Sequence, residues 1–154
     1  MSRAVSSVLG VLLLTALTLV LAGAVGAFAV DLNPGASEVT PHQLIANVNA
    51  TYGRISLIHQ SGPTLDVRKI DLRIIVDGTP LPHQPPVPYY SADGFHRFPK
   101  GPFNPMADPQ WEIGEEAMVI ATHGNRAAIT PDSQVRVELY RDGLRIAVTE
   151  TRAR

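Results

Sequence analysis

The sequence from Val8 to Val30 reads VLGVLLLTALTLVLAGAVGAFAV, which is 23 consecutive residues without a charged side chain. As an α-helix this segment would be about 34 Å long at about 1.5 Å per residue, enough to cross the ~30 Å hydrocarbon core of a bilayer. Its thirteen Leu, Val and Phe side chains outweigh three glycines, and Thr15 and Thr18 can return their hydroxyls to the preceding turn. We therefore predict a hydrophobic helix at 5–30 that can span a membrane.

Three interpretations of this helix remain open. A cleaved secretory signal would use Ala27-Phe28-Ala29, which has the A-x-A form of a cleavage site, although the apolar run is longer than the roughly 7–15 residues usual for a signal. The second interpretation is a permanent single-pass anchor. The third is a pilin-type segment, which is cut on the cytoplasmic side so that the helix stays with the mature protein. Arg3 before the helix favours a cytoplasmic N-terminus and an external remainder.

The first residues favour the third interpretation. The segment 2–14, Ser-Arg-Ala-Val-Ser-Ser-Val-Leu-Gly-Val-Leu-Leu-Leu, resembles the start of archaeal type IV pilins, in which a short basic leader ending in Arg-Ala or Lys-Gly precedes the apolar helix. Ser7 stands where that family usually has proline. The resemblance implies that a prepilin peptidase removes the leader 1–4 by cutting between Ala4 and Val5. Two later segments, 57–65 and 74–78, resemble the β-domain of the same family.

Small residues along the helix favour close packing between copies. Ala22 and Gly26 share one helix face, as do Gly23 and Ala27, and Gly10 is a further small position. Such spacings also arise by chance in segments rich in Ala and Gly. A helix that is apolar on all sides must nevertheless be buried on all sides, by lipid in a membrane or by other copies of itself in a filament.

The composition excludes several classes of function. The chain has 154 residues, a formal net charge of -1 and no cysteine. Disulfides, thiolate metal sites and thiol catalysis are therefore excluded, and the absence of a basic stripe argues against nucleic acid as a partner.

Residues 41–154, after a linker at 31–40, predict an external β-domain of about six strands with no amphipathic helix. Asp142-Gly143 supplies the positive φ that a two-residue hairpin turn needs, and Thr51-Tyr52-Gly53 joins another hairpin. We expect an antiparallel, immunoglobulin-like β-sandwich beside the N-terminal helix. The expected strands lie at 44–50, 54–60, 72–76, 117–122, 135–141 and 144–150.

The loop 80–111 differs in character from the rest. It contains nine of the 13 prolines and six of the nine aromatic residues. Such a long insertion is usually functional or disordered, and its aromatic content argues against disorder. Either the loop folds over an open edge of the sandwich and adds its rings to the core, or it presents them as a surface for adhesion or subunit contact. The rings concerned are Tyr89, Tyr90, Phe95, Phe98, Phe103 and Trp111.

No catalytic, cofactor or metal site is predicted. The five histidines have no metal-ligand spacing and are interpreted as surface or loop residues. The adjacent Glu115 and Glu116 would point to opposite faces of a strand, which favours a solvated loop. Asn49-Ala50-Thr51 fits the acceptor pattern for N-glycosylation at a predicted turn. The histidines are His42, His59, His83, His96 and His123.

The leading hypothesis is a structural role as a pilin rather than an enzyme. Its partners would be membrane lipid before assembly, the prepilin peptidase, and copies of itself in an extracellular filament built through the helix 5–30. The resemblance implies adhesion to a surface or cell ligand as the use of that filament. The alternative is a monomeric, membrane-anchored β-sandwich that binds a partner through the aromatic loop. The sequence does not distinguish a major from a minor pilin, and it does not indicate the adhesion target.

Overall fold

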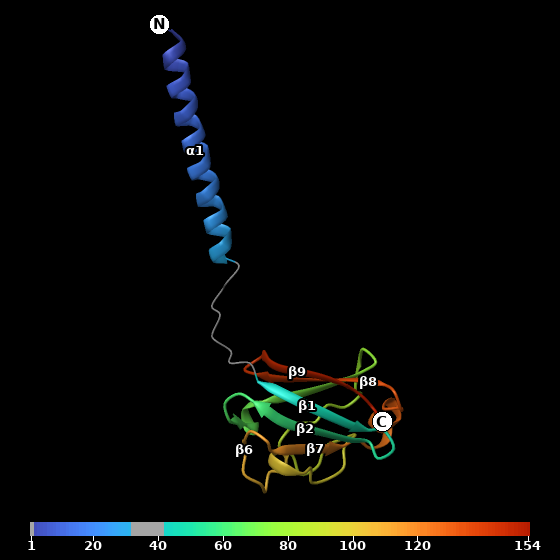
Figure 1. Cartoon of the computed structure of the whole chain (residues 1–154). Coiled ribbons are helices and arrows are strands. Elements are labelled where there is room, and N and C mark those ends of the chain that lie inside the picture. The colour runs from blue at the N-terminus through green and yellow to red at the C-terminus, as the bar shows by residue number, and fades with distance from the viewer. Residues whose placement is uncertain (1, 32–41) are drawn as a thin grey trace. The chain divides into compact units, whose positions relative to one another are not determined.

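The computed structural model describes the backbone of residues 2–31 and 42–154, and the side chains of 8–22 and 42–154 (Figure 1). The chain divides into two compact units, Met1–Val39 and Thr40–Arg154. The predicted linker lies, apart from Asp31, outside the described residues.

The N-terminal unit is the helix α1, Ser2–Asp31. It confirms the predicted helix and begins three residues before the expected start at Val5. Its Leu-rich composition suits a helix, because Leu is not branched at Cβ and loses little rotamer freedom there. Within the described part of the chain, no helix meets the combined length and hydropathy of a membrane span.

The second unit is mainly β, as predicted. Six of its strands have five or more residues, which agrees with the expected number, and three more have only two. The strands are β1 (Gln43–Asn49), β2 (Arg54–Ser61), β3 (Leu65–Asp66), β4 (Asp71–Val76), β5 (Thr79–Pro80), β6 (Gln110–Trp111), β7 (Glu116–Ile120), β8 (Gln134–Arg141) and β9 (Leu144–Arg152).

Short helical turns interrupt the strands. Two are 3-10 helices, η1 (Val67–Lys69) and η2 (Gly101–Phe103), and one is the six-residue α-helix α2 (His123–Ala128). We predicted no helix after the linker, so α2 is a correction. Only Asn125 of α2 is buried, and a helix that buries so little has no apolar periodicity by which the sequence could predict it.

All strand pairs within the three sheets are antiparallel. The sheets have the orders β1-β2-β7, β5-β4-β8-β9 and β3-β6. The predicted turn between β8 and β9 is confirmed, because Asp142 and Gly143 have φ values of 52° and 78°. These angles match the right-handed twist of the two strands that the turn joins.

The two larger sheets meet where β1 lies beside β9. Backbone hydrogen bonds join them at both ends, from His42 N to Ile146 O (3.4 Å) and from Arg154 N to Val48 O (3.0 Å). The residue numbers rise together along this seam, so the two strands run in the same direction. Figure 1 shows β1, β2 and β7 side by side, with β9 along the margin of β1.

One hydrophobic core fills the β-domain. Alternate residues of β1 are buried, and the buried residues of β2, β4, β7 and β8 join them in a single cluster. Leu57, Ile74 and Val137 are fully buried there. The helix-plus-β architecture is thus confirmed, and the immunoglobulin-like form of the sandwich stays a prediction.

Candidate functional site

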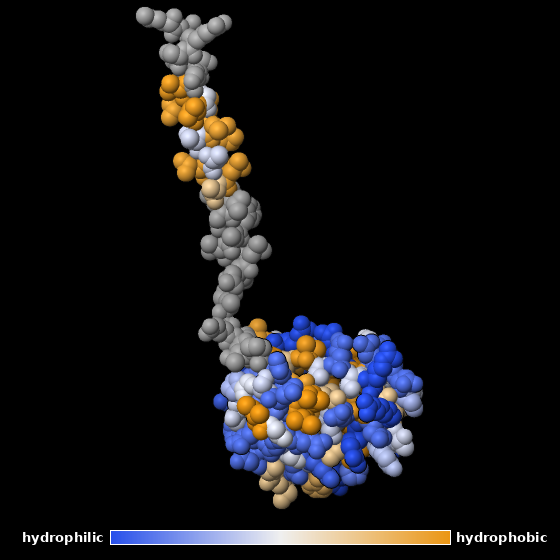
Figure 2. Space-filling model, viewed as in Figure 1, coloured by the Kyte–Doolittle hydropathy of each residue, from blue (hydrophilic) through white to orange (hydrophobic). Residues whose placement is uncertain are grey.

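Figure 2 shows hydrophobic side chains along the visible face of the described part of α1. Ten large hydrophobic side chains between residues 8 and 21 are 54–74% exposed. Full burial of one such side chain is worth roughly 1.5–3 kcal/mol, so the helix surface has at least about 10 kcal/mol to gain from being covered. The ten are Val8, Leu9, Val11, Leu12, Leu13, Leu14, Leu17, Leu19, Val20 and Leu21.

Two threonines and a glycine interrupt this surface. Thr15 Oγ1 donates to Val11 O and Thr18 Oγ1 donates to Leu14 O, each over 3.1 Å. Both hydroxyls are therefore satisfied inside the helix, as predicted, and neither needs water. A Cβ placed on Gly10 would meet nothing within 4 Å, so no other described part of the chain packs there. The missing side chain permits a neighbouring helix to approach the backbone closely.

The other residues predicted for cleavage and helix packing also belong to α1. Ala4 and Val5 have helical backbone, and their side chains lie outside the described residues. Ala22 is exposed. Cleavage between Ala4 and Val5 and packing through the small residues both stay predictions. The remaining small positions, whose side chains are likewise outside the described part, are Gly23, Gly26 and Ala27.

Four of the six aromatic residues in the loop 80–111 are buried. Of the two alternatives for these rings, addition to the core is confirmed for Tyr89, Phe95, Phe103 and Trp111, and a contact surface was the wrong one. The rings of Phe103 and Trp111 pack edge to face with centroids 5.2 Å apart. The indole N–H of Trp111 is satisfied, because Nε1 donates to Glu115 O over 2.8 Å. For Tyr89, burial raises the pKa of the hydroxyl to about 12. These four rings extend the core, because burying an aromatic side chain removes a large apolar area from water.

The same loop covers the free edge of β7. Lys100 and Met118 exchange two backbone hydrogen bonds of 3.0 and 3.1 Å, and His96 N donates to Ile120 O over 2.8 Å. An open strand edge is a template for pairing with another chain. The loop therefore closes an edge that would otherwise promote aggregation.

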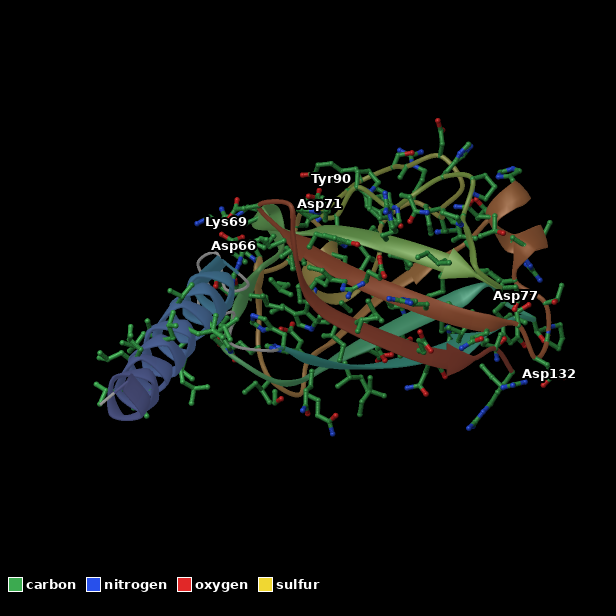
Figure 3. All side chains as sticks on the ribbon, turned by 90° about the horizontal axis from the view of Figure 1, so that it is seen from above. Asp66, Lys69, Asp71, Asp77, Tyr90 and Asp132 are labelled. Carbon is green, nitrogen blue, oxygen red and sulfur yellow. The ribbon has the colours of Figure 1, made fainter. Side chains whose placement is uncertain are left out.

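Two aromatic residues of the loop remain exposed, Tyr90 at 56% and Phe98 at 51%. Their rings meet edge to face with centroids 6.3 Å apart, and Figure 3 shows Tyr90 at the margin of the β-domain. Phe98 has a φ of 56°, which costs a bulky residue roughly 1–2 kcal/mol, and its N–H donates to Tyr90 O over 3.0 Å. Of the six rings considered for a contact surface, only Tyr90 and Phe98 are exposed enough to form one.

His42 and His59 are buried, so their interpretation as surface residues was wrong. His42 Nδ1 lies 3.4 Å from His59 Nε2, and His59 Nδ1 lies 3.2 Å from Trp111 O. Burial, aided by His59 and Arg141, lowers the pKa of His42. The sequence could have predicted the burial of His59, because His59 follows Ile55 and Leu57 at alternate positions of β2 and such positions face the same side of a strand. The exposed histidines are His83, His96 and His123.

The glycosylation pattern lies at the turn between β1 and β2. Asn49 is half-buried at the end of β1, and its Oδ1 accepts a hydrogen bond from Tyr52 N over 3.0 Å. The side chain therefore stabilises the turn, as Asn commonly does. Attachment of a glycan to Asn49 stays a prediction.

Glu138 is the buried carboxylate of the described β-domain. Two arginines and a tyrosine hydroxyl compensate the charge that is buried there. It lies 2.9 Å from Arg136 and 3.2 Å from Arg145, and the Tyr140 hydroxyl donates to it over 2.7 Å. The Tyr140 hydrogen bond and the two guanidinium groups lower the pKa of Glu138. Among the described residues, no three His, Cys, Asp or Glu side chains are grouped to hold a metal ion.

Comparison with known families adds one finding. Residues 3–45 match the family model described as archaeal type IV pilin, N-terminal. Residues 3–45 are therefore similar to this N-terminal domain, and the resemblance stated for residues 2–14 is confirmed. The match covers less than a third of the 154 residues and ends inside β1. A comparison with curated proteins found no match.

Proposed function

We propose that this chain is a pilin, the structural subunit of an archaeal type IV pilus-like filament on the cell surface. One observation carries the proposal. A helix with exposed hydrophobic side chains all around it precedes a β-domain that has its own core, in a chain whose first residues match the pilin N-terminal domain.

The helix supplies the driving force for insertion and then for assembly. As a precursor, the chain holds α1 in the membrane, where lipid covers the ten exposed Val and Leu side chains. Prepilin peptidase removes residues 1–4, and the helix then exchanges lipid for the helices of other copies. This exchange needs close contact between helices, which Gly10 and the small residues near 22–27 permit.

The β-domain faces outward and gives the filament its surface. Tyr90 and Phe98 are the aromatic side chains of the loop that remain available for adhesion. The same exposed pair also favours a second candidate function, a monomeric membrane-anchored module that binds a partner through these rings. The two functions differ in whether copies of α1 contact one another.

Electron microscopy of material sheared from the cell surface tests the proposal. Cells that express the full chain should yield filaments, and mass spectrometry of the sheared fraction should find this protein in them. As a control, the same cells would export residues 40–154 behind a cleavable secretory signal in place of α1. The control should release the β-domain without filaments. Filaments of normal number in the control, or none with the full chain, would reject the pilin and leave the monomeric module.

A further inference from the structure

An apolar pocket lies beside the covered edge of β7. It has a volume of about 300 Å³ and is lined by the segment 96–100 together with Met118 and Ile120. Phe98 and Pro99 contribute apolar wall from one side, and Met118 and Ile120 from the other. The pocket is therefore of a size to take one aliphatic or aromatic side chain.

The rim of this pocket is cationic. Arg97 and Lys100 are exposed members of the lining, and neither forms an ion pair among the described residues. The Arg97 guanidinium lies 5.6 Å from the centroid of the Phe98 ring, which holds the charge at the rim. Glu116 is the acidic residue of neighbouring β7, and no ion pair joins it to Lys100. The pocket thus favours an apolar group flanked by carboxylates.

The turn between β6 and β7 presents such a group. Ile113 is 61% exposed at the tip, and Glu112 and Glu115 flank it in the sequence Glu-Ile-Gly-Glu. The tip is held in one shape, because Gly114 N donates to His59 O over 2.7 Å and Glu115 N donates to Glu112 O over 3.2 Å. An isoleucine held out in water by a fixed turn has apolar area to bury in a partner.

We propose that the Ile113 tip of one copy inserts into the pocket at 96–100 of a second copy of this chain. Glu112 and Glu115 then face Arg97 and Lys100, so the charges of the two surfaces complement each other. The tip and the pocket are different surfaces of one β-domain. The contact is therefore heterologous, and each copy that joins leaves a free tip or a free pocket for the next.

This contact rests on the proposed filament and gives its outer layer a specific link. α1 supplies a force for association that is not directional, since any apolar surface can cover it. The tip and the pocket supply direction, because one side chain, one cavity and two pairs of opposite charges must align. Rim charges of this kind choose the partner and its orientation more than they add affinity.

Crosslinking in assembled filaments tests the contact, and the lack of native cysteine makes the thiols specific. Two full-length copies with different tags would be expressed in the same cells, one with Gln110→Cys beside the tip and the other with His96→Cys in the pocket lining. Ile113, Arg97 and Lys100 then stay in place. A short bis-maleimide reagent should join the two tagged copies. The matched control pairs Gln110→Cys with Thr79→Cys, an exposed position at β5, and should give about tenfold less product, because no contact holds that pair together. Equal yields from the two pairs would overturn the proposal.

Charge reversal supplies the second measurement. Arg97→Glu with Lys100→Glu, placed in the copy that carries His96→Cys, should abolish the crosslink. Glu112→Lys with Glu115→Lys, placed in the copy that carries Gln110→Cys, should abolish it as well. A copy with the first pair of changes mixed with a copy with the second should restore it. If filaments assemble normally, with α1 retained, and no crosslink forms, the contact is wrong and the pilin proposal stands. If no filaments form from the unaltered chain, both are wrong.

Discussion

The helix α1 exposes its hydrophobic side chains, whereas the β-domain buries them. In the β-domain the large core residues are almost fully buried, with Ile55, Leu65 and Leu139 at 0% exposure. In the described part of α1, every Leu and Val is more than half exposed. One region therefore completes its burial within a single chain, and the other leaves its hydrophobic surface uncovered. Under the proposed function, lipid or further copies cover that surface. The difference separates what keeps the domain folded from what drives it to assemble, and the predictions below test that separation.

The largest effect is expected from a charge in the middle of α1. Leu13→Arg should abolish filaments, because a central arginine costs about 2.5–3.5 kcal/mol in each membrane-inserted helix and recurs in every copy of an assembled core. The unfolding transition of the β-domain should not move. Filament counts by electron microscopy and thermal unfolding by circular dichroism measure the two effects. Leu13→Val is the matched control, and a normal filament count for Leu13→Arg would contradict the separation.

The opposite pattern is expected from the core of the β-domain. Trp111→Ala should lower the free energy of unfolding by about 3–5 kcal/mol, because it removes a fully buried ring that packs on Phe103. Tyr90→Ala, in the exposed pair of the same loop, should change it by less than about 0.5 kcal/mol. Denaturant titration of the full chain in detergent, followed by circular dichroism, compares them. Equal losses would mean that the loop does not divide into core and surface as described.

A smaller effect is expected at the polar face of the β-domain. Glu138→Gln should cost about 1–2 kcal/mol at neutral pH, because it weakens the hydrogen bonds and ion pairs with Tyr140, Arg136 and Arg145. The folded-state pKa of Glu138 is lowered from its usual value of 4.5. Its stabilisation is therefore complete above that value and is lost as the pH falls through the folded-state pKa. In the Glu138→Gln variant, the free energy of unfolding should therefore fall less steeply as the pH is lowered. An unchanged fall would argue against the interactions of Glu138 with Tyr140, Arg136 and Arg145.

The smallest effect is expected at the buried histidine pair. The pKa of His42 is lowered from its usual value of 6.5, so the unfolded chain binds a proton more readily than the folded one. Stability is complete above pH 6.5 and declines as the pH falls toward the folded-state pKa of His42. His42→Leu should reduce this decline, and it removes a buried nitrogen that lacks a hydrogen-bond partner. The measurement is the difference in unfolding midpoint between neutral and mildly acidic buffer, and an equal decline in both proteins would exclude His42 as its source.

Local patterns in the sequence predicted most of the fold. Hydrophobic composition predicted α1, and period-two alternation predicted the strands β8 and β9, because alternate residues of a half-buried strand face the core. Asp142-Gly143 predicted its turn from the positive φ that those residue types tolerate. In each case the deciding interaction lies within a few residues along the chain.

Local patterns could not predict the features that depend on contacts between residues distant in the sequence. Whether an aromatic ring of the loop 80–111 is buried depends on where the loop crosses β7, and neighbouring Tyr89 and Tyr90 have opposite fates. The burial of His42 beside His59 depends on the register between β1 and β2. The pocket beside Phe98 likewise needs the loop and β7 together. Local sequence contains none of these pairings, although the Glu-Ile-Gly-Glu tip could have been found from it.

The pilin proposal depends on a hydrophobic helix that is retained and becomes buried among its own copies. N-terminal sequencing of the mature protein from sheared surface filaments measures this retention. The mature protein should begin at Val5, with the whole segment from Val8 to Val30 still attached. A mature protein that begins near Val30 would contradict it, because the segment on which assembly depends would then be missing.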